Sequence, residues 1–262
     1  MSRYVALGSS MAAGPGIAPR AEGAPRRAGR SARNYPHLVA EKLGLDLVDV
    51  TYSGATTANV LREAQYGAPP QVSALDGTED LVTVTIGGND VGYVQMLFAA
   101  GLPRAVRRLP LLGGMLRAQL DPRARDAALT EVAASLEQVG RTLRTRSPRA
   151  TVLFVDYLTL LPPAGTAAPP LHEADVAVGR HIAETLQRLT AEAAAATGCG
   201  LVRVAAPSQA HHAWSAEPWT TKFGLLTFFH RGTPAPLHPN AAGMRAVAEL
   251  VVAQLKGPAT LT

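Results

Sequence analysis

Two serines follow the first apolar run of the chain, and a histidine lies near its other end. Ser9 and Ser10 come directly after Tyr4–Leu7 and Gly8, and His238 precedes a Pro-Asn pair. A serine hydroxyl is a weak nucleophile at neutral pH and needs a base to take its proton. Imidazole titrates near physiological pH, so His238 is the natural candidate for that base. These residue types predict nucleophilic catalysis, provided that the fold brings the two ends of the chain together.

Three further groups could stabilise the negative charge of a tetrahedral intermediate, which needs preorganised hydrogen-bond donors. Gly54, in the stretch SGATT, offers a backbone N–H with no side chain in front of it. Asn89, in the stretch GGND, offers a carboxamide. The backbone N–H of Ser10, at the start of a predicted helix, adds a third donor that the helix dipole favours. The sequence therefore contains a nucleophile, a base and the donors of an oxyanion hole.

The elements that would position these groups alternate along the chain. Five apolar, β-branched runs predict strands buried on both faces, namely Tyr4–Leu7, Leu45–Val50, Leu81–Ile86, Thr151–Val155 and Leu201–Val204. Apolar residues at helical spacing predict helices over Asp126–Arg144, Asp175–Ala196 and Ala242–Leu255. This alternation predicts an α/β fold in which helices cover both faces of a parallel sheet. Ligands of such sheets bind beyond the carboxyl ends of the strands, where the polar motifs above begin.

Taken in order and spacing, these motifs resemble the conserved blocks of the SGNH/GDSL hydrolases, a family of serine esterases and lipases. The blocks are Gly8-Ser9-Ser10, Gly54, Gly88-Asn89-Asp90 and His238-Pro239-Asn240, and the surrounding sequence resembles the actinobacterial branch. The resemblance covers almost the whole chain. It implies a three-layer α/β/α sandwich of the flavodoxin-like type with a central five-stranded parallel sheet.

The resemblance also implies the role of each group. Ser10 would attack a carboxylic ester and form an acyl-enzyme, and His238 would act as the base. The backbone N–H groups of Ser10 and Gly54 and the amide of Asn89 would form the oxyanion hole. No metal or organic cofactor is implied, and the expected partner is a small-molecule ester or a lipid.

The sequence departs from the family pattern at two positions. Ser9 stands where the family usually has Asp, and we expect this to alter local hydrogen bonds without abolishing the chemistry. Ala235 stands where the family usually has the Asp that orients the histidine. A backbone carbonyl can accept the same hydrogen bond, so we expect the carbonyl of Ala235 to orient His238 in a Ser-His dyad. Asp90 and Glu217 remain as rival acids, although a helix-capping role suits Asp90 better.

Composition narrows the class of protein. The 262 residues are 47% apolar and 17% charged, which predicts one globular domain over 1–262 with a substantial core. Residues 93–125, with Leu, Phe and Met between prolines and arginines, predict a helical insertion or a lid that shapes the acyl pocket. Residues 12–33 are rich in Gly, Pro and Arg and predict a loop. The net charge of +5 comes from scattered arginines, which argues against a nucleic-acid partner.

A few residues bear on the cellular location of the protein and on whether it binds a metal. No run approaches transmembrane length, so stable membrane insertion is not expected. The lone Cys199 and the lack of a recognisable signal peptide predict a cytoplasmic protein, or a secreted one if a leader has been removed. His211 and His212 lack a convincing third ligand and predict no metal site.

Two alternatives remain from the sequence. The same acyl-enzyme could pass its acyl group to a sugar or another alcohol, which would make the protein an acyltransferase. The missing acid could instead mark a non-catalytic, ligand-binding relative. The sequence leaves the acyl-chain length, the alcohol and the oligomeric state open.

Overall fold

Five parallel strands form one sheet at the centre of the computed structural model, which describes residues 2–107, 109, 112–224 and 234–257. The strands are β1 (Arg3–Gly8), β2 (Asp46–Asp49), β3 (Leu81–Thr85), β4 (Thr151–Val155) and β5 (Gly200–Val202). Their order is β2-β1-β3-β4-β5, and every neighbouring pair is parallel. The predicted five-stranded parallel sheet is confirmed.

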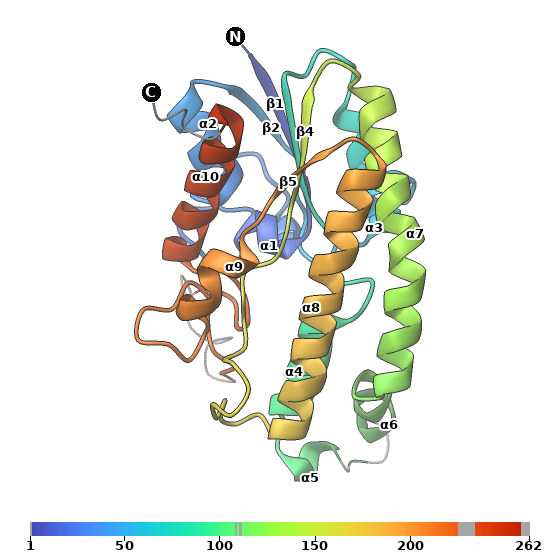
Figure 1. Ribbon diagram of the computed structural model, residues 1–262, viewed down its shortest axis with the longest axis vertical. Coiled ribbons are helices and arrows are strands. Elements are labelled where there is room, and N and C mark those ends of the chain that lie inside the picture. The colour runs from blue at the N-terminus through green and yellow to red at the C-terminus, as the bar shows by residue number, and fades with distance from the viewer. Residues whose placement is uncertain (1, 108, 110–111, 225–233, 258–262) are drawn as a thin grey trace.

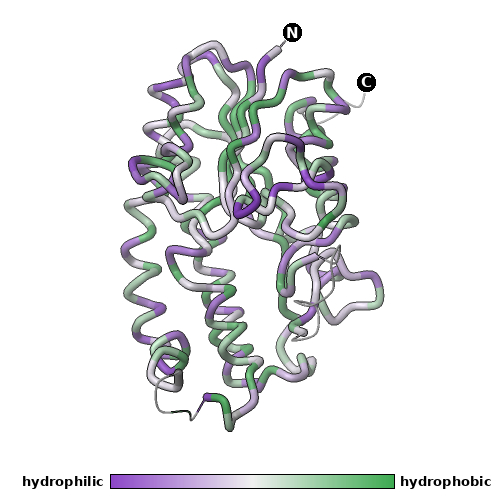
Figure 2. Tube along the Cα trace, turned by 180° about the vertical axis from the view of Figure 1, so that it is seen from behind, coloured by the Kyte–Doolittle hydropathy of each residue, from purple (hydrophilic) through white to green (hydrophobic). Residues whose placement is uncertain are grey.

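Helices cover both faces of this sheet. On one side lie α2 (Tyr35–Leu43) and α10 (Ala241–Lys256), and on the other lie α7 (Pro122–Arg146) and α8 (Glu173–Ala196) (Figure 1). Side chains alternate along β1 accordingly. Tyr4 and Ala6 pack with the first pair of helices, whereas Val5 and Leu7 pack with the second. Figure 2 shows the apolar strands enclosed between these layers. The three-layer architecture is therefore as predicted.

The two edge strands differ from their prediction. β1, β3 and β4 are almost wholly buried, but β2 and β5 are mostly half-exposed. The expectation that all five strands are buried on both faces is wrong for these two, because each has a neighbour on one side only. β5 also begins at Gly200 and ends at Val202, earlier than the predicted run.

Shorter elements gather where the strands end. α1 (Ser10–Ala13) follows β1, and α3 (Thr57–Leu61) follows β2. The predicted helical segment 93–125 contains α4 (Tyr93–Gly101), α5 (Arg104–Arg107), α6 (Leu112–Gln119) and the start of α7, and it extends beyond the carboxyl ends of the strands (Figure 1). The remaining elements are η1 (Arg26–Ala28), η2 (Gln71–Ala74), α9 (Ala205–Ser208) and η3 (Gln209–His211). The predicted loop 12–33 therefore includes the end of α1 and the turn η1.

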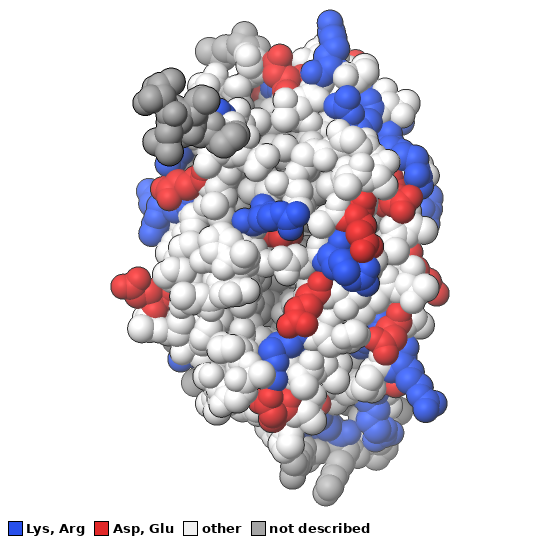
Figure 3. Space-filling model, viewed as in Figure 1, with Lys and Arg blue, Asp and Glu red and all other residues white. Residues whose placement is uncertain are grey.

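Charged side chains on the outer face of α8 alternate in sign. Arg180 pairs with Glu173, and Arg188 pairs with Glu192. Figure 3 shows acidic and basic groups interspersed along this side of the molecule. Within the described residues, none of the helices has the length and apolar character needed to cross a membrane.

Candidate active site

The end of β1 determines where Ser10 lies. Gly8 adopts φ 141°, a conformation that side-chain-bearing residues rarely adopt. A Cβ at this position would lie 2.5 Å from the carbonyl oxygen of Thr85 on β3, so only glycine fits. The backbone N–H of Ser9 then donates to the same carbonyl at 2.9 Å. This turn places Ser10, which is 7% exposed, as the first residue of α1 at the carboxyl edge of the sheet.

His238 approaches Ser10 from the other end of the chain. It lies two residues before Asn240, whose side chain caps α10 by accepting from the N–H groups of Ala242 and Gly243. The preceding Leu237 is fully buried and has φ 59°, which is uncommon for a non-glycine residue. The half-buried imidazole of His238 is thereby directed at the nucleophile turn.

The imidazole bridges Ser10 and a backbone carbonyl. Its Nε2 lies 2.9 Å from the Oγ of Ser10, and its Nδ1 lies 2.7 Å from the carbonyl oxygen of Pro236. Because a carbonyl only accepts, Nδ1 carries the proton and the lone pair of Nε2 faces the serine hydroxyl. Burial lowers the pKa of His238 below its usual 6.5, and the bond to Pro236 opposes that shift. The ring is therefore neutral at pH 7, as a base must be.

The carbonyl that orients His238 differs from the one expected. The prediction that Ala235 supplies it is wrong: the carbonyl of Ala235 instead accepts the hydroxyl of Thr221 at 2.6 Å. The left-handed conformation of Leu237 turns the chain, so the carbonyl of Pro236, two residues before the histidine, faces the ring.

Neither rival acid contacts the histidine. Asp90 accepts from the backbone N–H of Thr57 at 3.0 Å and from its hydroxyl at 2.6 Å, so it holds the start of α3 as a cap would. Burial raises the pKa of Asp90. Glu217 offers only its main-chain carbonyl, to the Nδ1 of His211 at 2.8 Å. Over the described parts of the chain, the histidine has no carboxylate partner, and the geometry is that of a dyad.

The three expected oxyanion donors surround one space. Ser10, Gly54 and Asn89 all line the same cavity. The N–H of Ser10 is the first of α1 and has no acceptor within the helix. Gly54 has φ 79°, which favours glycine at that turn. The amide of Asn89 donates one hydrogen to the carbonyl of Ala55 at 2.9 Å, which leaves its second hydrogen for another acceptor.

This cavity has a volume of about 560 Å³. Its apolar wall comes from α4 and α6, through Val94, Phe98, Met115 and Leu116. No Asp, Glu, Lys or Arg is among its described lining residues. The space therefore suits an uncharged, apolar group placed against the Ser10 hydroxyl.

Comparison with known proteins shows the family of the chain. Residues 6–246 match the GDSL-like lipase/acylhydrolase family. The chain belongs to this family. Among similar proteins, lipase 2 of Streptomyces coelicolor is 35% identical, over 94% of this chain and 83% of the relative. The chain is accordingly a carboxylic ester hydrolase.

Solved structures of other family lipases share the fold. The phospholipase A1 of Streptomyces albidoflavus NA297 superposes with a TM-score of 0.78 at 25% identity, covering 98% of this chain and 99% of that one. An extracellular lipase of Streptomyces rimosus gives a TM-score of 0.78 at 26% identity, covering 96% and 99%.

Two residues of this GDSL-like site were not found from the sequence. The hydroxyl of Tyr157, beyond the end of β4, accepts from the N–H of Gly88 at 2.8 Å. Ser9 is the N-cap residue of α1, and its side chain makes no capping hydrogen bond. Because Tyr157 closely follows a predicted strand, the sequence could have indicated that it lies near the site. No sequence feature indicated Thr221, whose hydroxyl donates to the carbonyl of Ala235 in the histidine loop.

The histidines outside the dyad have other contacts. The His211 ring stacks on Trp219, with centroids 4.1 Å apart, and backbone atoms of Trp214 contact His212. Among the described residues there is no group of three or more His, Cys, Asp or Glu side chains that could hold a metal ion.

Proposed function

We propose that the protein hydrolyses carboxylic esters through an acyl-enzyme on Ser10, with His238 as the general base. The observation that carries this proposal is the 2.9 Å contact between Ser10 Oγ and His238 Nε2. The other ring nitrogen, Nδ1, is hydrogen-bonded to the carbonyl of Pro236. A base within hydrogen-bond reach of a nucleophile, and itself oriented by a third group, is the arrangement that activates serine.

The reaction proceeds in two halves. Ser10 Oγ attacks the ester carbonyl while its proton passes to His238 Nε2, and the imidazolium then protonates the departing alcohol. Water, deprotonated by the same nitrogen, releases the acid and restores Ser10. The oxyanion of each tetrahedral intermediate is stabilised by the N–H groups of Ser10 and Gly54 and by the free amide hydrogen of Asn89.

The dyad differs from a triad in how it stabilises the imidazolium. The carbonyl of Pro236 presents a dipole to Nδ1 where a triad presents a full negative charge. It fixes the tautomer, which is the larger part of the acid's task, and contributes less to the charge on the ring. The base is therefore oriented as in a triad but has a lower pKa.

Lipid-like esters fit the cavity best. Its apolar wall and lack of charged lining residues favour an aliphatic acyl chain, and about 560 Å³ is within the range of ligand pockets. The similar proteins include a lipase of S. coelicolor and a phospholipase A1 of S. albidoflavus, which supports a lipid ester as the substrate class. We infer that residues 93–125 shape the acyl site.

A series of p-nitrophenyl esters from acetate to laurate, assayed with the wild type and with Ser10→Ala, tests the proposal. We expect hydrolysis by the wild type, loss of activity in Ser10→Ala, and a fluorophosphonate adduct on the peptide that contains Ser10. Ser9→Ala is the matched control and should keep the adduct on Ser10. Absence of both turnover and labelling would favour a ligand-binding protein, and faster p-nitrophenol release with added alcohol would indicate acyl transfer.

Location and partners remain to be tested in cells. The cytoplasmic location expected from the sequence stays a prediction, and the extracellular lipase of S. rimosus supports the secreted alternative. Activity in the culture medium of the source cells, compared with a lysate, distinguishes the two. The single domain over 1–262 and the lack of a nucleic-acid partner also stay predictions.

A further inference from the structure

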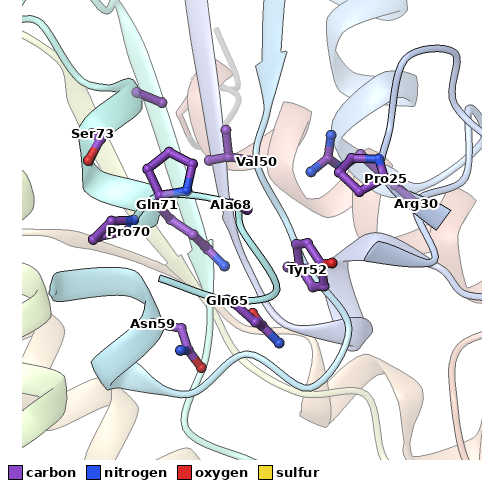
Figure 4. Close-up of a pocket in the computed structure, with 12 residues that line it drawn as sticks. Pro25, Arg30, Val50, Tyr52, Asn59, Gln65, Ala68, Pro70, Gln71 and Ser73 are labelled. Carbon is purple, nitrogen blue, oxygen red and sulfur yellow. The ribbon is translucent and has the colours of Figure 1, made fainter. Parts of the chain in front are cut away.

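A second cavity, of about 270 Å³, lies beside η2 and the chain that follows β2. Gln71, from η2, is part of its lining and is only 5% exposed. Figure 4 shows the Gln71 side chain extending from η2 toward the central strands. Its carboxamide contacts Gly8, two residues before Ser10.

Gln71 makes two hydrogen bonds to a single residue. The N–H of Gly8 donates to Oε1 at 2.7 Å, and Nε2 donates to the carbonyl of Gly8 at 3.0 Å. Only this orientation of the amide gives each donor an acceptor, so the assignment of oxygen and nitrogen is fixed by the partners. The side chain thus binds the end of β1 as a neighbouring strand would.

Gly8 needs this partner because the ladder with β2 has ended. Paired residues run only as far as Ala6 and Asp49. Tyr52 still donates to the carbonyl of Gly8 at 2.9 Å, but the N–H of Gly8 finds its acceptor on Gln71. On the opposite edge, β3 holds the turn through Thr85. The turn is therefore held from both sides, one of which depends on a side chain.

The backbone of Gly8 makes this support important. A residue held in a sparsely populated conformation keeps it only where the surrounding contacts impose it. With φ 141°, Gly8 turns the chain from β1 into α1 and so sets both the hydroxyl and the N–H of Ser10. Weakening one side of the turn would shift nucleophile and oxyanion donor together.

The Gln71 anchor is itself fixed. Pro69 and Pro70 precede it, and proline restricts φ. Ser73 donates to the carbonyl of Pro70 at 2.9 Å, and the side chain of Val72 is buried in the core. Arg146, at the end of α7, donates to the carbonyl of Val72 at 3.3 Å. Gln71 therefore transmits the position of η2 to Gly8.

We propose that Gln71 is a positioning residue for the Ser10 nucleophile. It touches neither the Ser10–His238 pair nor the acyl cavity and acts through the two bonds to Gly8. This inference rests on the proposed esterase function. It predicts that loss of the carboxamide slows acylation while substrate binding is retained, because the acyl wall is built from other elements.

Gln71→Met, which has a similar length and no strong hydrogen-bonding group, is the first test. We expect kcat and the rate of fluorophosphonate labelling to fall roughly 10- to 100-fold, the scale of a modest misplacement, with KM within about twofold. Tyr4→Phe is the matched control, because it removes a buried hydrogen bond to Thr83 (2.7 Å) from the same strand. Its kcat should be unchanged even where its Tm falls. An unchanged kcat in folded Gln71→Met would overturn the inference.

Gln71→Glu gives a readout that a purely structural role would not produce. The protonated acid can donate to the Gly8 carbonyl and accept from the Gly8 N–H, whereas the carboxylate has no donor. Burial raises the pKa of a carboxyl, so this exchange should occur above the usual value of about 4.3. We expect the ratio of Gln71→Glu to wild-type kcat to rise as the pH falls. A flat ratio, with the variant folded, contradicts the proposal.

A measurement that needs no turnover separates the positioning role of Gln71 from the proposed esterase function. A wild type that hydrolyses no ester would refute the proposed function alone. The ¹⁵N NMR signal of His238 Nε2 reports the hydrogen bond from Ser10 in either case. It should shift in Gln71→Met and stay in place in Tyr4→Phe. An unshifted signal in Gln71→Met would refute the positioning role.

Discussion

The nucleophile turn and the histidine loop meet at one hydrogen bond but are built in different ways. Ser10 follows a central strand, and main-chain bonds to β3 fix the turn before it. His238 lies in an irregular segment that the sheet does not reach. An isolated bridge between Thr220 and Pro239 and the bonds of Thr221 hold it instead. One partner is thus placed by the sheet, and the other by a few local contacts.

Thr221 shows how concentrated those contacts are. Its N–H donates to the carbonyl of His238 at 2.9 Å, and its own carbonyl accepts from Leu237 at 3.1 Å. Its hydroxyl donates to Ala235 at 2.6 Å and lies 3.2 Å from the N–H of His238. The loop also keeps Leu237 in a left-handed conformation, which costs about 1–2 kcal/mol for a non-glycine residue. The base should therefore be easier to displace than the nucleophile strand.

Removing the base has the largest expected effect. In His238→Ala, Ser10 has no acceptor for its proton, and we expect kcat to fall by about 10⁴-fold or more. Steady-state kinetics on a p-nitrophenyl ester measure this. His181→Ala, an exposed histidine on α8, is the control and should keep full activity. Substantial activity in His238→Ala would mean that another group acts as the base.

Loosening the histidine loop should have an intermediate effect. Thr221→Val removes the hydroxyl bound to Ala235, and we expect kcat to fall about 10- to 100-fold, or roughly 1.4–2.7 kcal/mol in activation free energy. Thr221→Ser should restore most of the rate.

The neighbouring Thr220→Val is the matched control. Thr220 is buried, and its hydroxyl has no hydrogen-bond partner among the described residues. Its loss should leave kcat unchanged and should not lower Tm. Equal rate losses in both threonine variants would show that the bonds of Thr221 do not position the base.

The pH dependence of kcat/KM tests how the histidine loop sets the protonation of His238. Only neutral imidazole can accept the proton of Ser10, and burial lowers the pKa of His238 below 6.5. We therefore expect kcat/KM to rise with pH, to level off before neutrality, and to fall about tenfold for each pH unit below that pKa. A plateau reached only above pH 7 would indicate that a carboxylate supports the imidazolium after all.

The sheet and the nucleophile could be predicted because both follow from short-range rules. Apolar runs gave the five strands, and a motif directly after a strand has little freedom in direction. Ser10 therefore lies where the sequence placed it, with His238 against it. The error over β2 and β5 has the same origin, since an apolar run does not reveal which strand has a neighbour on one side only.

The contacts that hold the site could not be predicted, because they depend on irregular backbone. Choosing Pro236 over Ala235 required the φ of Leu237, which nothing in its residue type foretells. Gln71 reaches Gly8 across 63 residues of sequence from a turn that no motif marks. Such residues are found only from coordinates, although each acts on a residue that the sequence identified.

Asp156 lies between the two regions, and its expected effect is on stability and not on rate. It lines a small cavity together with Met11 of α1 and Pro239. Its Oδ1 accepts from the N–H of Val204 at 2.5 Å and of Ala205 at 3.1 Å. Oδ2 is buried without a partner among the described residues. Burial raises the pKa of Asp156 to about 6, against the bonds at Oδ1, so the neutral acid persists to higher pH in the folded protein than in the unfolded chain.

The sign of the pH dependence follows from that shift. The folded-state pKa is above the unfolded value of about 3.9, so its stabilising contribution is complete below about pH 4 and is lost as the pH rises through about 6. Asp156→Asn keeps the Oδ1 acceptor and does not titrate. Its Tm should therefore exceed that of the wild type at pH 8, by an amount corresponding to about 2–3 kcal/mol, and the gain should shrink toward pH 4. A Tm difference that does not change with pH would show that the Asp156 carboxyl does not titrate in this range. The ionisation of Asp156 would then have no part in the contact between the two regions.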